Sequence, residues 1–326
     1  MSEDRSVLFL GIDTSCYTTS IAIVNAQGKL LDDRRIVLPV AVGKKGLKQS
    51  TALFLHWRNL PALISEVFSR EKAQKIAAIA VSFRPRPSEN SYMPVFSAGT
   101  ALAESAAALL GVPLVKTSHQ EGHIAAGLWS VSVESLKNFL VLHLSGGTTE
   151  LIIADKSETQ PLCFTLKVIG GSLDIQAGQL VDRVGVAMGL SFPSGRELEK
   201  TAVEYQREKG HPIIPSSVKG CWMSFSGAET MAKSYLEKKY SFPAVVRAVE
   251  HCIAVSVEKA LRNAVGDTGI TDILLVGGVA ANGYIKSRLI KRLEHKAVGA
   301  RLFFPEIQYC GDNAVGVALI ARSMYN

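Results

Sequence analysis

Two similar segments, 131 residues apart, most constrain how this chain can fold. Residues 7–24 (VLFLGIDTSCYTTSIAIV) and 138–155 (NFLVLHLSGGTTELIIAD) each contain an apolar run, a turn of small and hydroxyl residues, and a second apolar run. This pattern is typical of a β-hairpin whose turn exposes N–H and hydroxyl groups that could hold a phosphate or a carbonyl. The repeat predicts a duplicated domain.

A third segment contains a different glycine turn. Residues 272–293 (DILLVGGVAANGYIKSRLIKRL) predict a strand, a turn at Gly277 and Gly278, and a helix that starts near Asn282. Glycines let a ligand ring approach the backbone, and a helix N-terminus favours negative charge. The segment matches neither the G-x-G-x-x-G fingerprint nor the Walker A loop, so neither a dehydrogenase nor a P-loop enzyme is indicated.

Helical patterns lie between the predicted strands, at 53–70, 99–111 and 174–190. Strands that alternate with helices indicate an α/β fold. A length of 326 residues favours two domains. We expect an N-terminal domain over 1–125 and a C-terminal domain with inserted helices over 126–326. The cleft between them is the expected ligand site.

His119 and His123 are four residues apart in SHQEGHIAAG, a spacing that places both imidazoles on one face of a helix. The zinc-protease pattern H-E-x-x-H needs Glu directly after the first His, but Gln120 stands there. Glu121 would point away from the histidine face. A protease is therefore disfavoured. By itself the pair is either two packed or solvated histidines, or part of a metal site with a third ligand from elsewhere.

The composition, with 47% hydrophobic and 20% charged residues, fits a folded globular protein. Five scattered cysteines without a C-x-x-C pair fit free thiols in a reducing compartment. The sequence shows neither a signal-peptide nor a membrane-span pattern, so we expect a cytoplasmic protein without a membrane partner. A net charge of +7 leaves nucleic acid open as a partner, although basic segments such as that of Lys44, Lys45 and Lys48 are more often solvated.

Together, these segments resemble a known superfamily. The two hairpins and the strand, glycine turn and helix resemble the actin, Hsp70 and sugar-kinase (ASKHA) superfamily, which implies duplicated actin-like domains with a nucleotide and metal cleft between them. Within it, six motifs look like the TsaD family, formerly called O-sialoglycoprotein endopeptidases, in the same order and across almost the whole chain. They are SHQEGH, LSGGTTEL, AGQLVDRVGVAMGLSFPSG, MSFSGAET, VGGVAAN and YCGDNAVGVA.

The resemblance implies a reaction and a metal site. TsaD proteins transfer a threonylcarbamoyl group from threonylcarbamoyl-AMP to an adenosine of tRNA, and they commonly act with partner proteins. The family's motifs imply that His119, His123 and Asp312 bind a divalent metal. Mixed nitrogen and carboxylate ligands suit Zn²⁺ or Fe²⁺, with Mg²⁺ as a further candidate. Asp312 could also cap the helix that follows it.

The resemblance further implies an adenine nucleotide ligand, which is ATP, AMP or threonylcarbamoyl-AMP. Asp182 matches the family's ribose-binding acid, although without the resemblance it would be interpreted as a solvated helix residue. Gly195 and Asn282 match adenosine contacts, and the turn at Ser145 matches the phosphate or carbamoyl turn. The candidates for nucleotide binding are Ser145, Gly146, Gly147, Asp182, Gly195, Gly277, Gly278 and Asn282. The catalytic candidates are the hydroxyl groups of Thr18, Ser145 and Thr148.

The chain departs from the family's motifs at four places around the expected reacting centre. Cys16-Tyr17-Thr18-Thr19 replaces C-D-E-T, and Thr148 and Glu150 replace the His and Gln of S-G-G-H-T-Q. RPRPSEN (84–90) replaces G-P-G-L, and Ser226-Gly227-Ala228-Glu229 replaces S-G-L-K. The departures indicate a divergent paralogue.

Several functions stay open at this level. A transferase would use tRNA as the acceptor, whereas a hydrolase would use water on the same adenylate or a related one. A nucleotide-binding regulator without catalysis would explain the departures as decay, but it has no evident need for a retained metal site. A sugar or acetate kinase suits the hairpins but gives the histidine helix no role.

Overall fold

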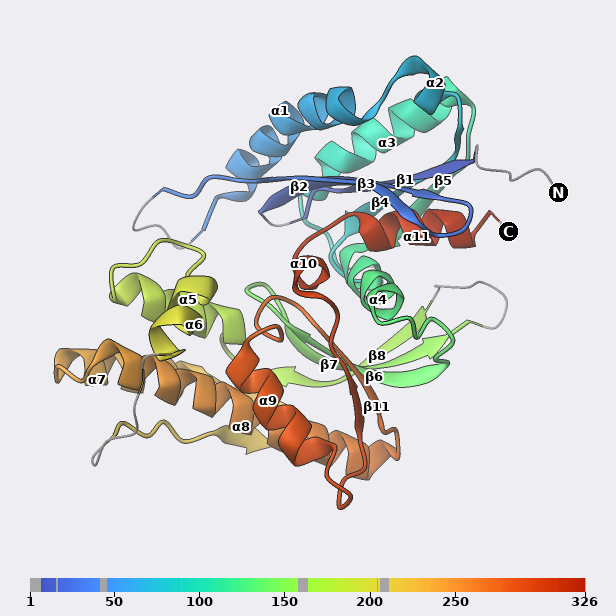
Figure 1. Cartoon of the computed structure of the whole chain (residues 1–326). Helices are drawn as coiled ribbons and strands as arrows, with labels where there is room; N and C mark the ends of the chain where they lie inside the picture. The colour runs from blue at the N-terminus through green and yellow to red at the C-terminus, as the bar shows by residue number, and fades with distance from the viewer. Residues whose placement is uncertain are drawn as a thin grey trace.

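The computed structural model describes residues 7–15, 17–41, 46–88, 90–157, 164–203, 205 and 211–325. These residues form two mixed sheets with helices on their outer faces (Figure 1). Helices α4 (His119–Ser130) and α11 (Val315–Ser323) lie between the sheets. Cys16, Cys163 and the basic pair Lys44 and Lys45 lie outside the described residues.

The first sheet has five strands, in the order β3–β2–β1–β4–β5. Their bounds are β1 Leu8–Asp13, β2 Thr18–Asn25, β3 Leu30–Val37, β4 Ile76–Arg84 and β5 Leu114–Ser118. Strand β1 pairs antiparallel with β2 and parallel with β4, and all six of its residues are buried. Both faces of this strand are covered, which explains its continuous apolar sequence. Helices α1 (Gln49–Val67) and α3 (Phe96–Leu110) pack on the outer face, and the short α2 (Arg70–Ala73) follows α1.

The second sheet has seven strands, in the order β12–β11–β6–β7–β8–β10–β9. Their bounds are β6 Asn138–Leu144, β7 Thr149–Lys156, β8 Phe164–Ser172, β9 Ser217–Lys219, β10 Trp222–Ser224, β11 Asp272–Val276 and β12 Arg301–Phe303. Strand β6 pairs antiparallel with β7 and parallel with β11. The run β8–β7–β6–β11–β12 therefore repeats the order and directions of the first sheet. This repeat confirms the predicted duplication of the hairpin unit.

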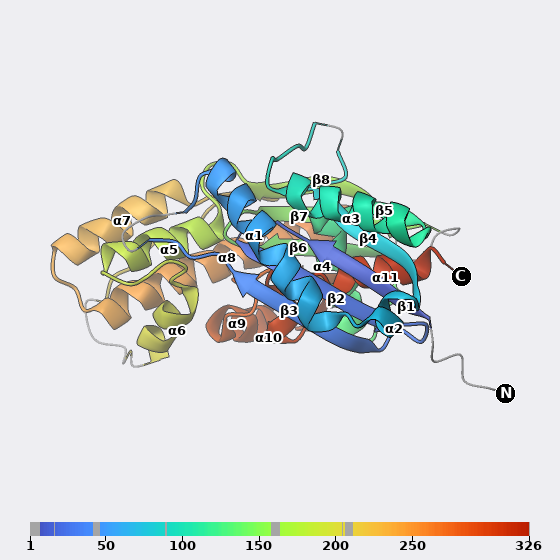
Figure 2. The same ribbon diagram turned by 90° about the horizontal axis from the view of Figure 1, so that it is seen from above.

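The remaining helices belong to the second half of the chain. They are α5 Ala177–Ala187, α6 Gly195–Val203, α7 Ser226–Glu237, α8 Phe242–Thr268, α9 Gly283–Leu293 and α10 Ile307–Cys310. The long α8 contributes most of its buried apolar side chains to the core on the outer face of the second sheet. Figure 2 shows α5, α6 and α7 at one end of the molecule and α2 with the end of α11 at the other. Among the described residues, no helix combines the length and the apolar character that a membrane crossing requires. The cytoplasmic location stays a prediction.

The close crossing of α4 and α11 joins the two halves. A Cβ atom on Gly316 of α11 would lie only 1.8 Å from the carbonyl oxygen of Gly122 on α4, so only glycine fits there. Helix α11 also packs on β1, β2 and β4, which returns the C-terminal segment to the first sheet. The domain boundary expected after residue 125 stays a prediction.

Candidate metal and nucleotide site

Helix α4 presents the two histidines of the predicted metal site. Its first turn is fixed by a capping box, in which Ser118 Oγ accepts from the N–H of Glu121 and Glu121 Oε2 accepts from the N–H of Ser118. Glu121 is thus committed to the helix start. The Nε2 atoms of His119 and His123 lie 3.0 Å apart, because the spacing of four places both rings on one face.

Asp312 brings a carboxylate to these rings from the loop before α11. Its Oδ1 lies 3.4 Å from Nε2 of His119 and 3.5 Å from Nε2 of His123. One ligand atom from each of the three residues falls within 4.8 Å of the others, which is the size and donor set that a divalent cation requires. Asp312 does not cap α11, since Ala314 is the N-cap residue and Asn313 Oδ1 accepts from the N–H of Val315.

Asp13 is a part of this site that the sequence analysis missed. Its Oδ2 lies 3.0 Å from Nδ1 of His119, and the same side chain accepts hydrogen bonds from Ser15 and Ser82. Burial by itself would raise the pKa of Asp13, but His119 and Ser82 outweigh it and lower this pKa below its usual value. A carboxylate at the end of a buried strand was the signal in the sequence that could have pointed to it.

The two carboxylates favour a positive charge on His119. Burial by itself would lower the pKa of His119, but Asp13 and Asp312 outweigh it and raise this pKa to about 10. Burial and the charge of His119 lower the pKa of His123, so the second ring stays neutral. A divalent cation would supply the charge that the proton on His119 supplies otherwise, so the residues fit a metal.

A third histidine, His143 on β6, lies against this cluster and was also missed. Its ring centroid is 4.8 Å from that of His123, and its side chain is buried. Burial, with His123 next, lowers the pKa of His143 well below its usual value. Among the described residues, neither ring nitrogen of His143 has a hydrogen-bond partner, nor does Nδ1 of His123. Buried polar atoms are normally paired, so unpaired nitrogens are unusual; His143 also lines the cavity of this site and can meet a ligand there.

The glycine turn between β6 and β7 forms the second part of the site. The N–H of Thr148 donates to Ser145 Oγ (3.1 Å), and the N–H of Ser145 donates to the carbonyl of Thr148 (2.8 Å). Helix α5 begins against this turn, where a Cβ atom on Gly178 would lie 2.5 Å from the backbone nitrogen of Gly146. The positive end of α5 therefore adjoins the turn, as an anion would require.

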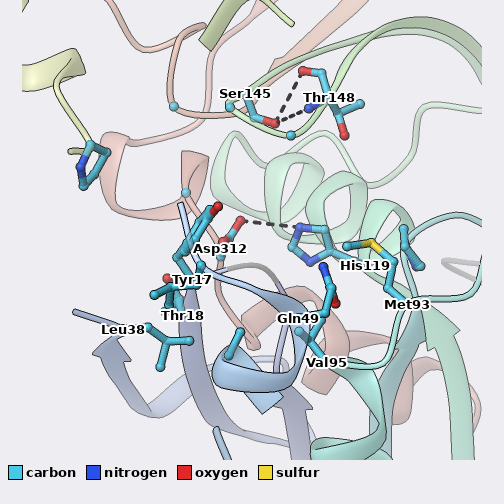
Figure 3. Close-up of a pocket in the computed structure, with 18 of the residues that line it drawn as sticks. Tyr17, Thr18, Leu38, Gln49, Met93, Val95, His119, Ser145, Thr148 and Asp312 are labelled. Atoms are coloured by element: carbon cyan, nitrogen blue, oxygen red, sulfur yellow. Dashed lines mark hydrogen bonds and ion pairs between the residues drawn. The ribbon is translucent and has the colours of Figure 1, made fainter. Parts of the chain in front are cut away.

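A cavity of about 760 Å³ connects these two parts. Figure 3 shows Ser145 and Thr148 on one side, Tyr17 and Thr18 on the other, and His119 with Asp312 between them. The predicted residues that line the cavity are Thr18, His119, Ser145, Gly146, Gly147, Thr148, Asp182, Gly278 and Asp312. His123, Gly195, Gly277 and Asn282 do not line it.

Asn282 and Gly277 have local roles in the structure. Asn282 Oδ1 accepts from the N–H of Ile285 and so caps α9, while its Nδ2 donates to Glu250. Gly277 has φ +98°, and a Cβ atom there would lie 2.5 Å from the carbonyl oxygen of Leu144. Gly195 begins α6. Their contacts with a nucleotide stay predictions.

Asp182 lies between the glycine turn and α6. Its Oδ1 accepts from the N–H of Ser194 (2.7 Å), and burial raises its pKa above the usual value. Its other oxygen, Oδ2, would lie 3.8 Å from a Cβ atom added to Gly146. A carboxylate so close to the turn can accept a hydroxyl of a bound nucleotide.

Two of the departures from the family's motifs form ion pairs in this region. Glu150 pairs with Arg86 (2.6 Å) and accepts from Gln120 Nε2 (2.8 Å). Glu229 pairs with Arg183 (2.9 Å) and Lys233 (2.5 Å). Each introduced acid therefore meets a cation close by, and Arg86 and Arg183 both line the cavity.

The duplicated sheets around this cleft define a protein of the actin, Hsp70 and sugar-kinase class. Component A of (R)-2-hydroxyglutaryl-CoA dehydratase from Acidaminococcus fermentans has a TM-score of 0.58 to this chain at 14% identity, over 98% of this chain and 99% of that one. A ROK family glucokinase from Streptomyces griseus, solved with glucose and AMPPNP, has a TM-score of 0.52 at 13% identity, over 97% and 99%. At sequence identities this low, the similarity of these structures to this chain shows the fold alone.

The chain belongs to the TsaD family, the tRNA N6-adenosine threonylcarbamoyltransferases, whose model matches residues 44–319. A relative of that name from Thermotoga neapolitana is 30% identical over 322 residues, which cover 97% of this chain and 93% of the relative. The predicted family and the assignment as an enzyme, a transferase, are thereby confirmed. The membership supports tRNA modification of the TsaD type.

Proposed function

We propose that this protein is a metal-dependent transferase that moves the threonylcarbamoyl group of threonylcarbamoyl-AMP to an adenosine of tRNA. One observation carries the proposal beyond the family assignment. His119 and Asp312, with His123 behind them, converge on the same cavity as the glycine turn at Ser145. A metal-binding group and an anion-binding group in one cleft suit an acyl adenylate, which presents a carbonyl beside a phosphate.

The second half of the chain would hold the nucleotide. The N–H groups of Gly146 and Gly147 would face the phosphate near the positive end of α5, while Asp182 would accept a ribose hydroxyl. Gly278 borders the same cavity without a side chain, which leaves room for the adenosine. ATP and AMP share these groups with the acyl adenylate and would compete for the site.

The first half of the chain and α4 would hold the acyl group. A divalent metal bound by His119, His123 and Asp312 would supply a Lewis acid for the acyl carbonyl. Asp13 would fix the orientation of His119 through Nδ1. The hydroxyl groups of Thr18, Ser145 and Thr148 would orient the reacting groups, because all three residues line the cavity. In this proposal an adenosine of tRNA is the acceptor, and the protein acts with partner proteins of the kind that the family uses.

Hydrolysis of the same adenylate is the second candidate. Tyr17 and Thr18 border the cavity where the family's motif has an acidic pair, and Thr148 stands where it has His. These changes remove side chains that would contact a tRNA acceptor, and water needs no such contacts to attack the adenylate. A regulator without catalysis is disfavoured, because the three predicted metal ligands still converge.

A labelled substrate separates these functions. Metal-loaded protein would be incubated with threonine-labelled threonylcarbamoyl-AMP, with and without unmodified tRNA, while the label and free AMP are followed. Label on tRNA, abolished by His119→Ala but not by the exposed control His295→Ala, would establish the transferase. AMP released equally without tRNA would establish the hydrolase, and no AMP in either case would refute catalysis on this adenylate.

A further inference from the structure

The ion pair between Arg86 and Glu150 bridges the two halves of the molecule inside the cleft. Arg86 follows β4 of the first sheet, and Glu150 lies on β7 of the second. The guanidinium and carboxylate atoms are 2.6 Å apart, and both residues come from segments in which the sequence departs from the family's motifs. Opposite charges this close attract strongly in a partly buried place, so the ion pair holds Arg86 beside Glu150.

The surroundings of Glu150 place this pair at the metal cluster. Gln120, the neighbour of His119 on α4, donates to Glu150 Oε2 at 2.8 Å. In the register of β6 and β7, Glu150 lies directly opposite His143, whose ring packs against His123. The Glu150 side chain is only 14% exposed, so its carboxylate is a fixed anchor.

Arg86 keeps hydrogen-bonding capacity for a ligand. A guanidinium carries five N–H donors, and among the described residues the side chain has one partner, Glu150. Its Nε atom is buried without a hydrogen-bond partner in that part of the chain. The side chain is 42% exposed and lines the cavity, so its remaining donors can reach an anion there. Arginine suits a carboxylate because its planar fork can bind both oxygens.

We propose that Arg86 is a specificity-determining residue that binds the carboxylate of the substrate's acyl group, with Glu150 as the residue that positions it. The proposal rests on the function proposed above. With the acyl carbonyl at the metal cluster, the threonyl carboxylate is separated from it by only the carbamoyl nitrogen and the α-carbon. Arg86 lines the same cavity and pairs with Glu150 beside this cluster, whereas the phosphate is assigned to the turn at Ser145. The cleft would thus distinguish an acyl group that ends in a carboxylate from a neutral one.

Binding measurements on the metal-loaded protein test this role. The three probes are AMP, a non-hydrolysable analogue of threonylcarbamoyl-AMP, and the same analogue with a carboxamide in place of the threonyl carboxylate. Arg86→Met removes the charge and keeps most of the length, and Arg86→Lys keeps the charge without the fork. Arg84→Met is the matched control, because Arg84 lies in the same segment but does not line the cavity.

We expect Arg86→Met to weaken binding of the acid analogue about 10- to 100-fold, the loss typical of a charge-assisted hydrogen bond, and to leave AMP and the carboxamide unchanged. Arg86→Lys should lose less, and Arg84→Met should bind all three probes as the unaltered protein does. In turnover, Arg86→Met should raise KM with little change in kcat.

Two other outcomes would be informative. Equal weakening of the acid and the carboxamide in Arg86→Met would overturn the proposal and leave the pair as a bridge between the two halves. An unaltered protein that binds the acid analogue no better than AMP would instead refute the proposed substrate. Thermal unfolding of each variant verifies that it is folded. If Arg86→Met does not fold, the affinities of Arg86→Lys for the acid and the carboxamide decide whether Arg86 binds the carboxylate.

Discussion

Asp13 Oδ2 lies 3.0 Å from Nδ1 of His119, so a buried carboxylate from the first sheet orients an imidazole of the predicted metal site. When a metal replaces the proton on Nε2, this contact would keep the other proton of His119 on Nδ1 and leave Nε2 directed at Asp312 and His123. It also links the end of β1 to the start of α4. The geometry of the metal site therefore depends on how the first sheet packs against this helix.

Asp13→Asn should weaken binding of Zn²⁺ or Fe²⁺ about 10- to 100-fold, the usual effect of losing a carboxylate behind a histidine ligand. Competition with a chelator of known affinity would measure it. Asp32→Asn is the control, since Asp32 lies on β3 of the same sheet and pairs with Lys72 of α2. Metal affinity that stays the same in Asp13→Asn would show that His119 needs no such orientation.

Asp182→Asn should weaken AMP binding about 10- to 100-fold, because a charged acceptor for a ribose hydroxyl is replaced by a neutral one. The amide oxygen of Asn can still accept from the N–H of Ser194, so the loop should keep its place. Calorimetric titration with AMP gives the change, with the exposed Asp155→Asn for comparison. An unchanged affinity for AMP would mean that Asp182 only holds the loop at Ser194 and does not contact the nucleotide.

Gly316→Ala should destabilise the protein by about 3 kcal/mol or more, the upper end for overpacking, because the added methyl meets the backbone of α4. The metal site should weaken with it, since the crossing fixes α4 relative to the loop of Asp312. Gly266→Ala in α8 is the matched control: its Cβ meets nothing within 4 Å, and it should stabilise by up to about 1 kcal/mol. Denaturant unfolding would measure both, and equal stabilities would contradict the packing described for α4 and α11.

Asp174→Asn should destabilise the protein at neutral pH by about 1 kcal/mol, because Asp174 accepts the N–H groups of Phe225 and Ser226 at the start of α7. Burial by itself would raise the pKa of Asp174, but these bonds and those from the hydroxyls of Ser224 and Ser226 lower it well below its usual value. The stabilisation is therefore complete above the unfolded-state pKa of about 3.9 and is lost as the pH falls toward the lower folded-state pKa.

Unfolding free energies of the unaltered protein and Asp174→Asn should accordingly converge as the pH is lowered from 7 through 4 to below 3. The exposed Asp155→Asn serves as the matched control for replacing a carboxylate by an amide. A difference for Asp174→Asn that is the same at every pH would mean that its contribution does not depend on the carboxylate charge.

Local patterns in the sequence determined the duplicated hairpins, the α/β class and the facing pair of histidines on α4. Each of these depends on residues close together in the chain, where periodicity, turns and caps act. The three predicted helices also form, with shifted ends: α1 begins at Gln49 and ends at Val67, before the predicted end at residue 70. The family's motifs added Asp312, which no local pattern links to α4.

Only the tertiary structure decided which distant side chains complete the site. Asp13 and His119 are 106 positions apart, and Arg86 meets Glu150 from the other sheet. The packing of the first sheet against α4 and the approach of the two sheets across the cleft create these contacts, and neither is encoded within one segment. Packing of α8 against α9 also brings Glu250 to Nδ2 of Asn282, a residue predicted as a nucleotide contact, whereas its cap of α9 is a local contact. Side-chain chemistry is local, but the distances between reacting groups follow from how separate elements pack.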